Sequence, residues 1–294
     1  MKRYLGNKAA IAVFILPALT LFTVVVFYPM CQVFIKSFTK WNGVSAAVPI
    51  GIDNFVRLFR DPIFFVSLKN GIIYALVQVV LQMSIATVLA LGVSDAAIRF
   101  KKFLRISYFI PAVLSVTVVC QLWLSMYNAD FGLINKIFEV LGLSYRQNWL
   151  GSEKSGIVAI AVTTTWQFMG YQFILLLTAV RSIPEHYMEA ARLDGCSKWQ
   201  AHWYVTLPLM QESYRYCLVI SITGGLNAFS SMFIMTSGGP GTSTYSLSFL
   251  MYRAAFRLGE YGYGCAAAVF LITQCMAVTI VINRLVARER ITYS

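Results

Sequence analysis

Six long stretches of this chain contain no Asp, Glu, Lys or Arg, and no other feature constrains its fold as strongly. A helix needs about 20 mostly apolar residues to cross a membrane, and each stretch reaches that length. They are Ile11–Ile35, Asn70–Ser94, Ile106–Ala129, Ser155–Val180, Tyr216–Tyr252 and Tyr261–Asn283. The fifth is too long for one helix, and its tail from Ser237 to Thr244 is typical of a loop. We therefore expect an all-α membrane protein with six transmembrane helices and both ends on the same side.

The composition agrees with a membrane protein. Hydrophobic residues make up 58% of the 294 residues and charged residues only 12%, whereas soluble domains carry about 25% charged residues. The net charge of +12 could suggest nucleic acid as a partner. The basic residues are scattered between apolar runs, however, so positively charged loops at a membrane explain them better, and we expect no nucleic acid.

The first apolar run follows a basic start with Lys2, Arg3 and Lys8, which resembles the beginning of a signal peptide. The run is longer than the apolar region of a signal peptide and has no clear cleavage site, so we interpret it as the first membrane helix. A tight basic cluster, Arg99–Arg105, gives the strongest signal for orientation. Basic residues concentrate on the cytoplasmic side, which places both termini and the polar stretch after Val180 in the cytoplasm.

That polar stretch, from Ser182 to Pro208, has the signals of a helix, a turn and a second helix. Gly195 is a natural left-handed residue after the end of a first helix. Two predicted capping boxes open the two helices: Ser182 with Glu185, and Ser197 with Gln200.

The motifs Glu189-Ala190-Ala191, Asp194-Gly195 and Leu207-Pro208 resemble the E-A-A…D-G…L-P loop of type I ABC importer permeases. The resemblance implies that fold, and it implies a coupling helix that docks into a groove on a cytoplasmic ATPase. Its expected coupling residues are Glu189, Ala190, Ala191, Asp194, Gly195 and Pro208. The small residues would allow close approach, and the carboxylates would meet basic groups. An ordinary solvated amphipathic hairpin is the alternative. Cys196 stands where the family usually has another small residue.

Two further segments resemble carbohydrate-importer permeases. Thr236-Ser-Gly-Gly-Pro240 and Tyr252-Arg-Ala-Ala-Phe256 match the T-x-G-G-P and Y-x-x-A-F patterns of the outer loop after the fifth helix. Asp53-Asn54-Phe55 resembles a segment found before the second helix. The resemblance runs from about Gly51 to Val281 and implies an importer of a sugar or oligosaccharide. A plain Gly-rich turn followed by an interfacial helix is the alternative reading of the outer loop.

Polar residues within the fourth and fifth spans are candidates for the substrate pathway. Thr164, Gln167 and Tyr171 recur at a helical spacing, so they share one stripe. An aromatic ring beside amide and hydroxyl groups suits a sugar. In the family, the helices that flank the coupling loop contact the substrate, which adds Ser221, Gly224 and Asn227 as candidates. Gln78 and Gln82, one turn apart in the second span, are better explained by packing between helices.

The chain contains no G-x-x-x-x-G-K-[ST] motif that could cradle a nucleotide phosphate, so we expect no enzymatic activity, no catalytic residue and no bound cofactor. The resemblance implies that ATP and Mg²⁺ are used by two separate ABC ATPase subunits. It also implies a second, homologous permease subunit as a heterodimer partner and an external solute-binding protein. The expected location is the inner membrane of a bacterial or archaeal cell.

This interpretation divides the chain into four parts: a cytoplasmic tail (1–10), a first membrane helix with an outer amphipathic segment (11–69), a permease core of five helices containing the 182–208 loop (70–283), and a second cytoplasmic tail (284–294).

A different substrate and two other classes of membrane protein are the alternatives to this function. A permease for a polar non-sugar such as glycerol 3-phosphate is the nearest alternative. A secondary transporter would need carboxylates within the membrane, and none lies in the six stretches. A membrane-embedded enzyme would need a buried acid, base or metal constellation, and none is visible. The six cysteines form no C-x-x-C pair and have no suitably spaced histidine, so we expect no metal site.

Overall fold

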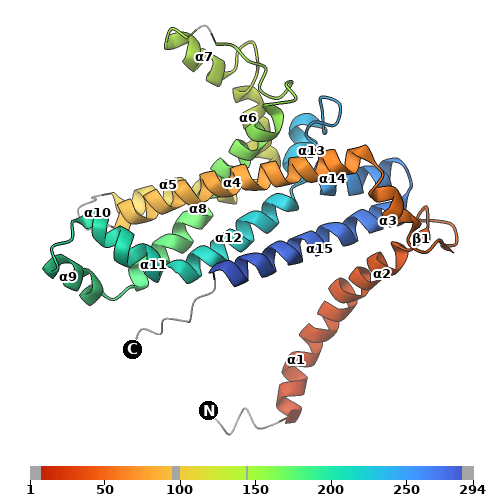
Figure 1. Ribbon diagram of the computed structural model, residues 1–294, viewed down its shortest axis with the longest axis horizontal. Helices are drawn as coiled ribbons and strands as arrows, with labels where there is room; N and C mark the ends of the chain where they lie inside the picture. Colours follow the sequence, from red (N-terminus) through yellow and green to blue (C-terminus); the bar gives the residue numbers. More distant parts are fainter. Residues whose placement is uncertain (1–7, 95–99, 144, 287–294) are drawn as a thin grey trace. The chain divides into compact units, whose positions relative to one another are not determined.

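The computed structural model describes residues 8–94, 100–143 and 145–286, and these residues are mainly helical (Figure 1). Most of the two predicted tails, with Lys2 and Arg3, lies outside the described residues, as does Arg99 of the basic cluster. The chain forms two compact units. Of the described residues, the smaller unit contains those before Pro62 together with Leu250–Phe270, and the larger unit contains those between Pro62 and Phe249 and those from Leu271 onward.

The described residues include four helical segments that are long and apolar enough to cross a membrane. The first, Ile11–Lys36, comprises α1 (Lys8–Phe22), a π-helical segment (Thr23–Phe27) and α2 (Tyr28–Lys36). The others are α4 (Pro62–Ser94), α8 (Gly156–Ser182) and α15 (Tyr261–Val286). Two bent helix pairs raise the number to six if each pair counts as one span. The predicted all-α membrane fold is confirmed, and six spans is the upper count.

The third predicted span is broken, which corrects the expectation of one continuous helix over Ile106–Ala129. α5 (Lys101–Val113) and α6 (Val116–Met126) meet at an angle of 99°. Leu114 and Ser115 between them have extended backbones, with ψ of 147° and 138°. The break frees the carbonyl of Leu114 from the helical ladder, and the side-chain amide of Gln167 donates to it at 3.1 Å.

The fifth predicted span is a bent pair followed by a loop. α12 (Gln211–Leu226) and α13 (Ser230–Thr236) meet at 44°. The residues after Thr236 form turns until α14 (Leu247–Tyr252) and a π-helical segment (Arg253–Arg257), so the expected loop is present.

A short antiparallel hairpin organises the smaller unit. β1 (Thr39–Lys40) pairs with β2 (Val48–Pro49), and α3 (Asp53–Leu58) follows. The amide of Asn54 donates to the carbonyls of Ser37 and Thr39 at 2.8 and 2.9 Å, which ties α3 to the hairpin. Gly262 permits the first turn of α15 to pack there as well, because a Cβ at this position would lie 1.9 Å from the carbonyl oxygen of Thr39.

Charged residues also tie α3 to the start of α15. The guanidinium of Arg57 donates two hydrogen bonds to the carboxylate of Glu260, at 3.0 and 2.8 Å, and lies 4.5 Å from the ring centroid of Tyr263. The Tyr263 hydroxyl donates to Asp61 at 2.7 Å. The hydrogen bond to Glu260 raises the pKa of Arg57 above its ordinary value, although partial burial opposes the shift.

The core of the larger unit is a group of closely crossing helices. α4 packs along α8 and against α12, while α5 packs on α8 and α13 on α6. Glycines allow two of the close approaches. A Cβ at Gly170 would lie 1.9 Å from the carbonyl oxygen of Tyr108, and one at Gly225 would lie 2.8 Å from the Cα of Ala75. Small residues at helix contacts are the usual means of packing membrane helices closely.

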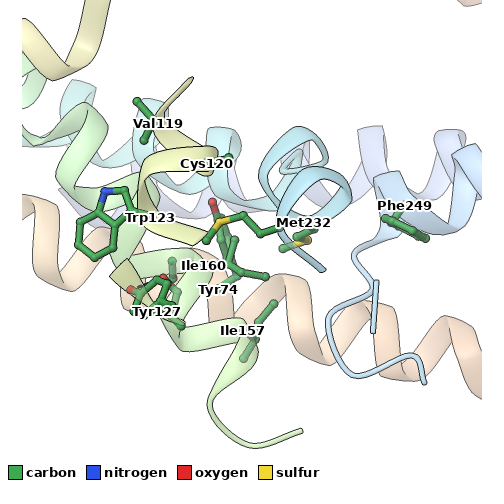
Figure 2. Close-up of a cluster of buried hydrophobic side chains, with 12 residues drawn as sticks. Tyr74, Val119, Cys120, Trp123, Tyr127, Ile157, Ile160, Met232 and Phe249 are labelled. Carbon is green, nitrogen blue, oxygen red and sulfur yellow. Dashed lines mark hydrogen bonds between the residues drawn. The ribbon is translucent and has the colours of Figure 1, made fainter. Parts of the chain in front are cut away.

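Two clusters of buried side chains fill this core. Figure 2 shows the first, in which side chains from α4, α6, α8 and α13 meet, among them Tyr74, Trp123, Ile160 and Met232. Figure 1 shows the order of these helices along the chain. The larger unit also contains four shorter helices: α7 (Leu133–Val140), α9 (Glu185–Leu193), α10 (Lys198–Ala201) and α11 (Leu207–Leu209).

Candidate functional site

A cavity of about 530 Å³ lies among the helices of the larger unit. α4, α6, α8 and α12 contribute to its wall, together with the bend between α12 and α13. Its lining residues are Tyr74, Gln78, Gln82, Val116, Thr164, Gln167, Phe168, Tyr171, Gln172, Ile220, Ser221, Gly224, Asn227, Ala228, Phe229, Ser230 and Ser231. This set contains amides, hydroxyls and aromatic rings but no charged side chain.

All six predicted pathway residues line this one cavity: Thr164, Gln167, Tyr171, Ser221, Gly224 and Asn227. The structure therefore brings together the two stripes of polar residues on the fourth and fifth predicted spans. Tyr171 is 41% exposed, so its ring is accessible within the cavity, whereas Gln167 is almost fully buried. The buried amide of Gln167 already bonds the carbonyl of Leu114, which gives this residue a structural contact in addition to its place in the lining.

A chain of hydrogen bonds crosses the cavity wall from α8 to α12 and on to α4. The amide nitrogen of Gln172 donates to the hydroxyl of Ser221 at 2.8 Å, and that hydroxyl donates to Oε1 of Gln82 at 2.8 Å. Gln82 and Gln172 are each at most 2% exposed. Amides held in this way resist rotation, so the chain fixes the shape of the polar wall.

Three buried amide atoms of this wall have no hydrogen-bond partner among the described residues: Oε1 of Gln78, Nε2 of Gln82 and Oε1 of Gln172. An unpaired buried amide is costly, on the order of 1–3 kcal/mol. These unpaired atoms lie within side chains that line the cavity.

A second hydrogen-bonded group closes another part of the cavity. The Tyr74 hydroxyl donates to Thr164 at 2.7 Å and lies 3.4 Å from the hydroxyl of Ser231. Sequence reasoning did not place Tyr74, Gln78 or Gln82 in the lining. Their spacing of four residues along one helix is the signal that could have identified them, because residues four apart share a helix face.

The stretch after α8 is a compact helical loop. α9 spans Glu185–Leu193, and α10, a π-helical segment (His202–Thr206) and α11 follow. α9 ends in a Schellman motif, in which the backbone N–H groups of Cys196 and Gly195 donate to the carbonyls of Ala191 and Arg192. Gly195 has a φ of +80°, as expected for the residue after a helix end. Ala191 is buried, whereas Glu189, Ala190, Asp194, Gly195 and Pro208 are exposed.

One predicted capping box is confirmed and the other is wrong. The side chain of Ser197 accepts from the backbone of Gln200, and the side chain of Gln200 accepts from the backbone of Ser197. Ser182, in contrast, still belongs to α8, and its hydroxyl donates to the carbonyl of Ala179. The extended residues lie one and two positions later, at Ile183 and Pro184. Ile183 comes directly before a proline, and such a residue avoids the helical conformation.

Contacts between the two halves of the loop hold α9 in place. The hydroxyl of Thr206 donates to the sulfur of Met188 at 3.6 Å and lies 3.1 Å from Nδ1 of His202. A Cβ at Gly195 would meet no atom within 4 Å, so this position is open on the surface of the chain. The loop thus presents Glu189, Ala190 and Gly195 on an exposed face.

The described residues contain no group of three or more His, Cys, Asp or Glu side chains that could hold a metal ion.

The loop between α6 and α8 is a structural unit of polar and aromatic contacts. Asn135 donates to the carbonyls of Ala129 and Gln147 and accepts from the indole of Trp149.

Apolar helices around an uncharged polar cavity, with a helical loop after α8, are features expected of a membrane permease. The model of the family described as "Binding-protein-dependent transport system inner membrane component" matches residues 8–291, and the chain belongs to this family.

Individual proteins agree with this assignment. The chain is 32% identical to the probable ABC transporter permease YurN of Bacillus subtilis, over 93% of this chain and 94% of that protein. It is 32% identical to MsmF, a permease of a multiple sugar-binding transport system of Streptococcus mutans, over 88% of each chain. A chain of a bacterial alginate ABC transporter, solved with an alginate-bound periplasmic protein, has the same fold, with a TM-score of 0.84, 21% identity and 99% coverage of both chains.

Proposed function

We propose that this chain is the permease subunit of an ATP-driven importer for a neutral sugar or oligosaccharide, and that the substrate crosses the membrane through the cavity of the larger unit. The observation that carries the proposal is the lining of that cavity. It joins amides, hydroxyls and the accessible ring of Tyr171 without any charged side chain. Sugars present hydroxyls that bond to amides and apolar ring faces that stack on aromatic side chains.

The size of the cavity and one of the relatives support a sugar as the substrate. The cavity of about 530 Å³ falls within the range of about 300–1,000 Å³ typical of small-molecule sites. MsmF is a permease of a multiple sugar-binding transport system. Glycerol 3-phosphate fits less well, because its phosphate would meet no cationic group in this lining.

The energy for transport is proposed to enter through the 182–208 loop. Two separate ATPase subunits would use ATP and Mg²⁺, and α9 would dock on one of them through Glu189, Ala190, Asp194 and Gly195, with Pro208 ending the loop. Ala191, expected to take part in the docking, is buried within the chain instead. A second homologous permease would complete the pathway, and an external solute-binding protein would deliver the substrate. The exposed face of α9, with its open Gly195, supports this assignment.

Uptake into proteoliposomes that contain the purified complex tests the substrate class. A panel of neutral oligosaccharides and their phosphorylated counterparts should give uptake of a neutral member only, and Tyr171→Ala should reduce it strongly. Val88→Ala is the matched control, since Val88 is 64% exposed on α4 and does not line the cavity. Uptake of phosphorylated compounds alone, or equal uptake by Tyr171→Ala and the control, would contradict the proposal.

The orientation is a separate test. We propose that both termini and the 182–208 loop are cytoplasmic, which places the loop containing Gly241 outside. A single cysteine in place of Gly241 should react with an impermeant maleimide added to whole cells whose outer envelope is permeable to the reagent. Labelling from the cytoplasmic side only would reverse the orientation.

A further inference from the structure

A second cavity of the larger unit lies against the helical loop, and two Arg side chains and one Lys side chain belong to its lining. Its volume is about 440 Å³. The titratable residues of its lining are Arg181 at the end of α8, Glu185 and Arg192 on α9, and Cys196, Lys198 and His202 after it. None of these residues lines the cavity proposed for the substrate.

The charges of this lining are unbalanced. Among the described residues, the lining contains the basic side chains of Arg181, Arg192 and Lys198 and one carboxylate, that of Glu185. Arg57, Arg146 and Arg215 each form a salt bridge with a carboxylate. In the described part of the chain, no salt bridge is present at Arg181 or Arg192. In the part of the chain that the structure describes, two guanidinium groups thus share this concave site with one carboxylate.

The position of the cavity indicates which negatively charged group could bind to these basic side chains. Arg181 lies in the last turn of α8, which is a candidate membrane span. Three large aromatic side chains on the adjoining segment are strongly exposed: Trp199 is 75%, Trp203 68% and Tyr204 69% exposed. Exposed Trp and Tyr beside basic residues are typical of the level of lipid headgroups, where phosphate groups are abundant.

We propose that this cavity is a binding site for a phosphate group, held by Arg181 and Arg192 with Lys198 nearby. Guanidinium groups match the geometry of phosphate oxygens and donate to them in pairs. The phosphate belongs either to the headgroup of an anionic phospholipid in the adjacent leaflet or to a soluble phosphate compound. Bound there, it joins the end of α8 to α9 and so fixes the position in which the loop presents Glu189. This proposal does not depend on the nature of the transported substrate.

Cys196 provides a reporter for the site, because it belongs to the lining and is partly exposed. The full chain is placed in nanodiscs of phosphatidylcholine alone or of phosphatidylcholine with phosphatidylglycerol. It is treated with N-ethylmaleimide at constant ionic strength, with inorganic phosphate replacing chloride in a titration. Modification of Cys196 is followed by peptide mass spectrometry, so the wild-type chain is used unchanged.

We expect occupancy of the cavity to slow the modification of Cys196 severalfold. Protection by inorganic phosphate in neutral discs assigns the site to a soluble compound. Protection in the phosphatidylglycerol discs without added phosphate assigns it to a lipid headgroup. Arg181→Gln and Arg192→Gln should each weaken the protection about tenfold in concentration, because each removes a charge-assisted hydrogen bond. Arg181→Lys should recover part of it.

Lys102→Gln is the matched control, because it also removes one positive charge. Lys102 lies on α5, in the same basic cluster as Arg105, and it does not line the cavity. It should leave the protection unchanged. A rate at Cys196 that responds neither to phosphate nor to phosphatidylglycerol would overturn the proposal. Protection that persists undiminished in the Arg181→Gln/Arg192→Gln double variant would overturn it too.

Discussion

The cavity proposed for the substrate and the helical loop of the larger unit are built in opposite ways. The cavity wall depends on contacts between residues far apart in the chain: Gln82, Gln172 and Ser221 lie on three different helices and share one chain of hydrogen bonds. The loop depends on contacts between near neighbours, namely the Schellman motif at Gly195 and the capping box at Ser197. The cavity lining is uncharged, whereas the loop carries exposed charges.

This difference indicates that the cavity wall and the loop have separate roles. We expect the buried wall, which is built from long-range hydrogen bonds, to hold one shape and to select a ligand by its hydroxyls. A loop built from local motifs keeps its own shape when the helices around it move, so it can transmit a displacement as a rigid piece. Substitutions in the two regions should therefore reduce transport in different ways. Those in the wall should lower stability and ligand binding, and those on the exposed loop face should weaken coupling alone.

The largest effect is expected from Glu189→Lys on the exposed face of α9. Reversing a charge that pairs across an interface typically costs about 2–5 kcal/mol. Uptake should fall below detection while the amount of protein in the membrane fraction stays normal. Glu189→Gln, which keeps the shape and removes the charge, should give an intermediate rate. Wild-type uptake by Glu189→Lys would show that this face is not the coupling surface.

A pair of adjacent glycines offers the next test, at the helix contact behind the cavity wall. A Cβ at Gly225 would lie 2.8 Å from the Cα of Ala75, whereas one at Gly224 would meet nothing within 4 Å. Gly225→Ala should lower stability by about 1–3 kcal/mol through overpacking, and Gly224→Ala should raise it by about 0.5–1 kcal/mol through reduced backbone entropy. Thermal unfolding in detergent measures both, and equal shifts would mean that α4 and α12 do not cross this closely.

Ser221→Ala tests the hydrogen-bond chain itself. The change leaves the amides of both Gln82 and Gln172 without their shared partner, at a cost of about 1–3 kcal/mol in stability and a weaker hold on substrate. Thr223→Val on the same helix is the control, because the hydroxyl of Thr223 bonds only to carbonyls of its own helix. If both variants give the same binding and unfolding curves, these hydrogen bonds do not stabilise the cavity wall.

The sequence predicted much of both regions, for different reasons. The membrane spans follow from hydropathy, which is a sum over many residues and tolerates local errors. Gly195 and the Ser197 capping box were predictable because they depend on residues only a few positions apart. The stripes with Thr164, Gln167 and Tyr171 followed from helical periodicity, which places residues on a face without saying what that face meets.

What the sequence could not give depends on tertiary contacts. The 99° break after α5 is stabilised by Gln167, which lies more than fifty residues from Leu114 and satisfies its carbonyl. Gln78 and Gln82 were interpreted as packing residues, but they line the cavity as well, since only the crossing of α4 with α8 and α12 creates it. The missed end of α8 is a smaller case, because a serine two residues before a proline gives two readings: cap or last helical turn.

That last case gives the smallest and sharpest test. Ser197 caps α10 through its side chain, whereas the hydroxyl of Ser182 bonds back within α8. Ser197→Ala should therefore cost about 1 kcal/mol through the loss of a cap, and Ser182→Ala should be nearly neutral. Because α10 is local to the loop, Ser197→Ala should raise backbone amide hydrogen exchange in the loop and leave the helices of the cavity unchanged. If Ser182→Ala instead loosened α9 as much as Ser197→Ala loosens α10, Ser182 would be a cap after all. If the exchange spread into α8 and α12, the loop and the cavity would not be separately stabilised.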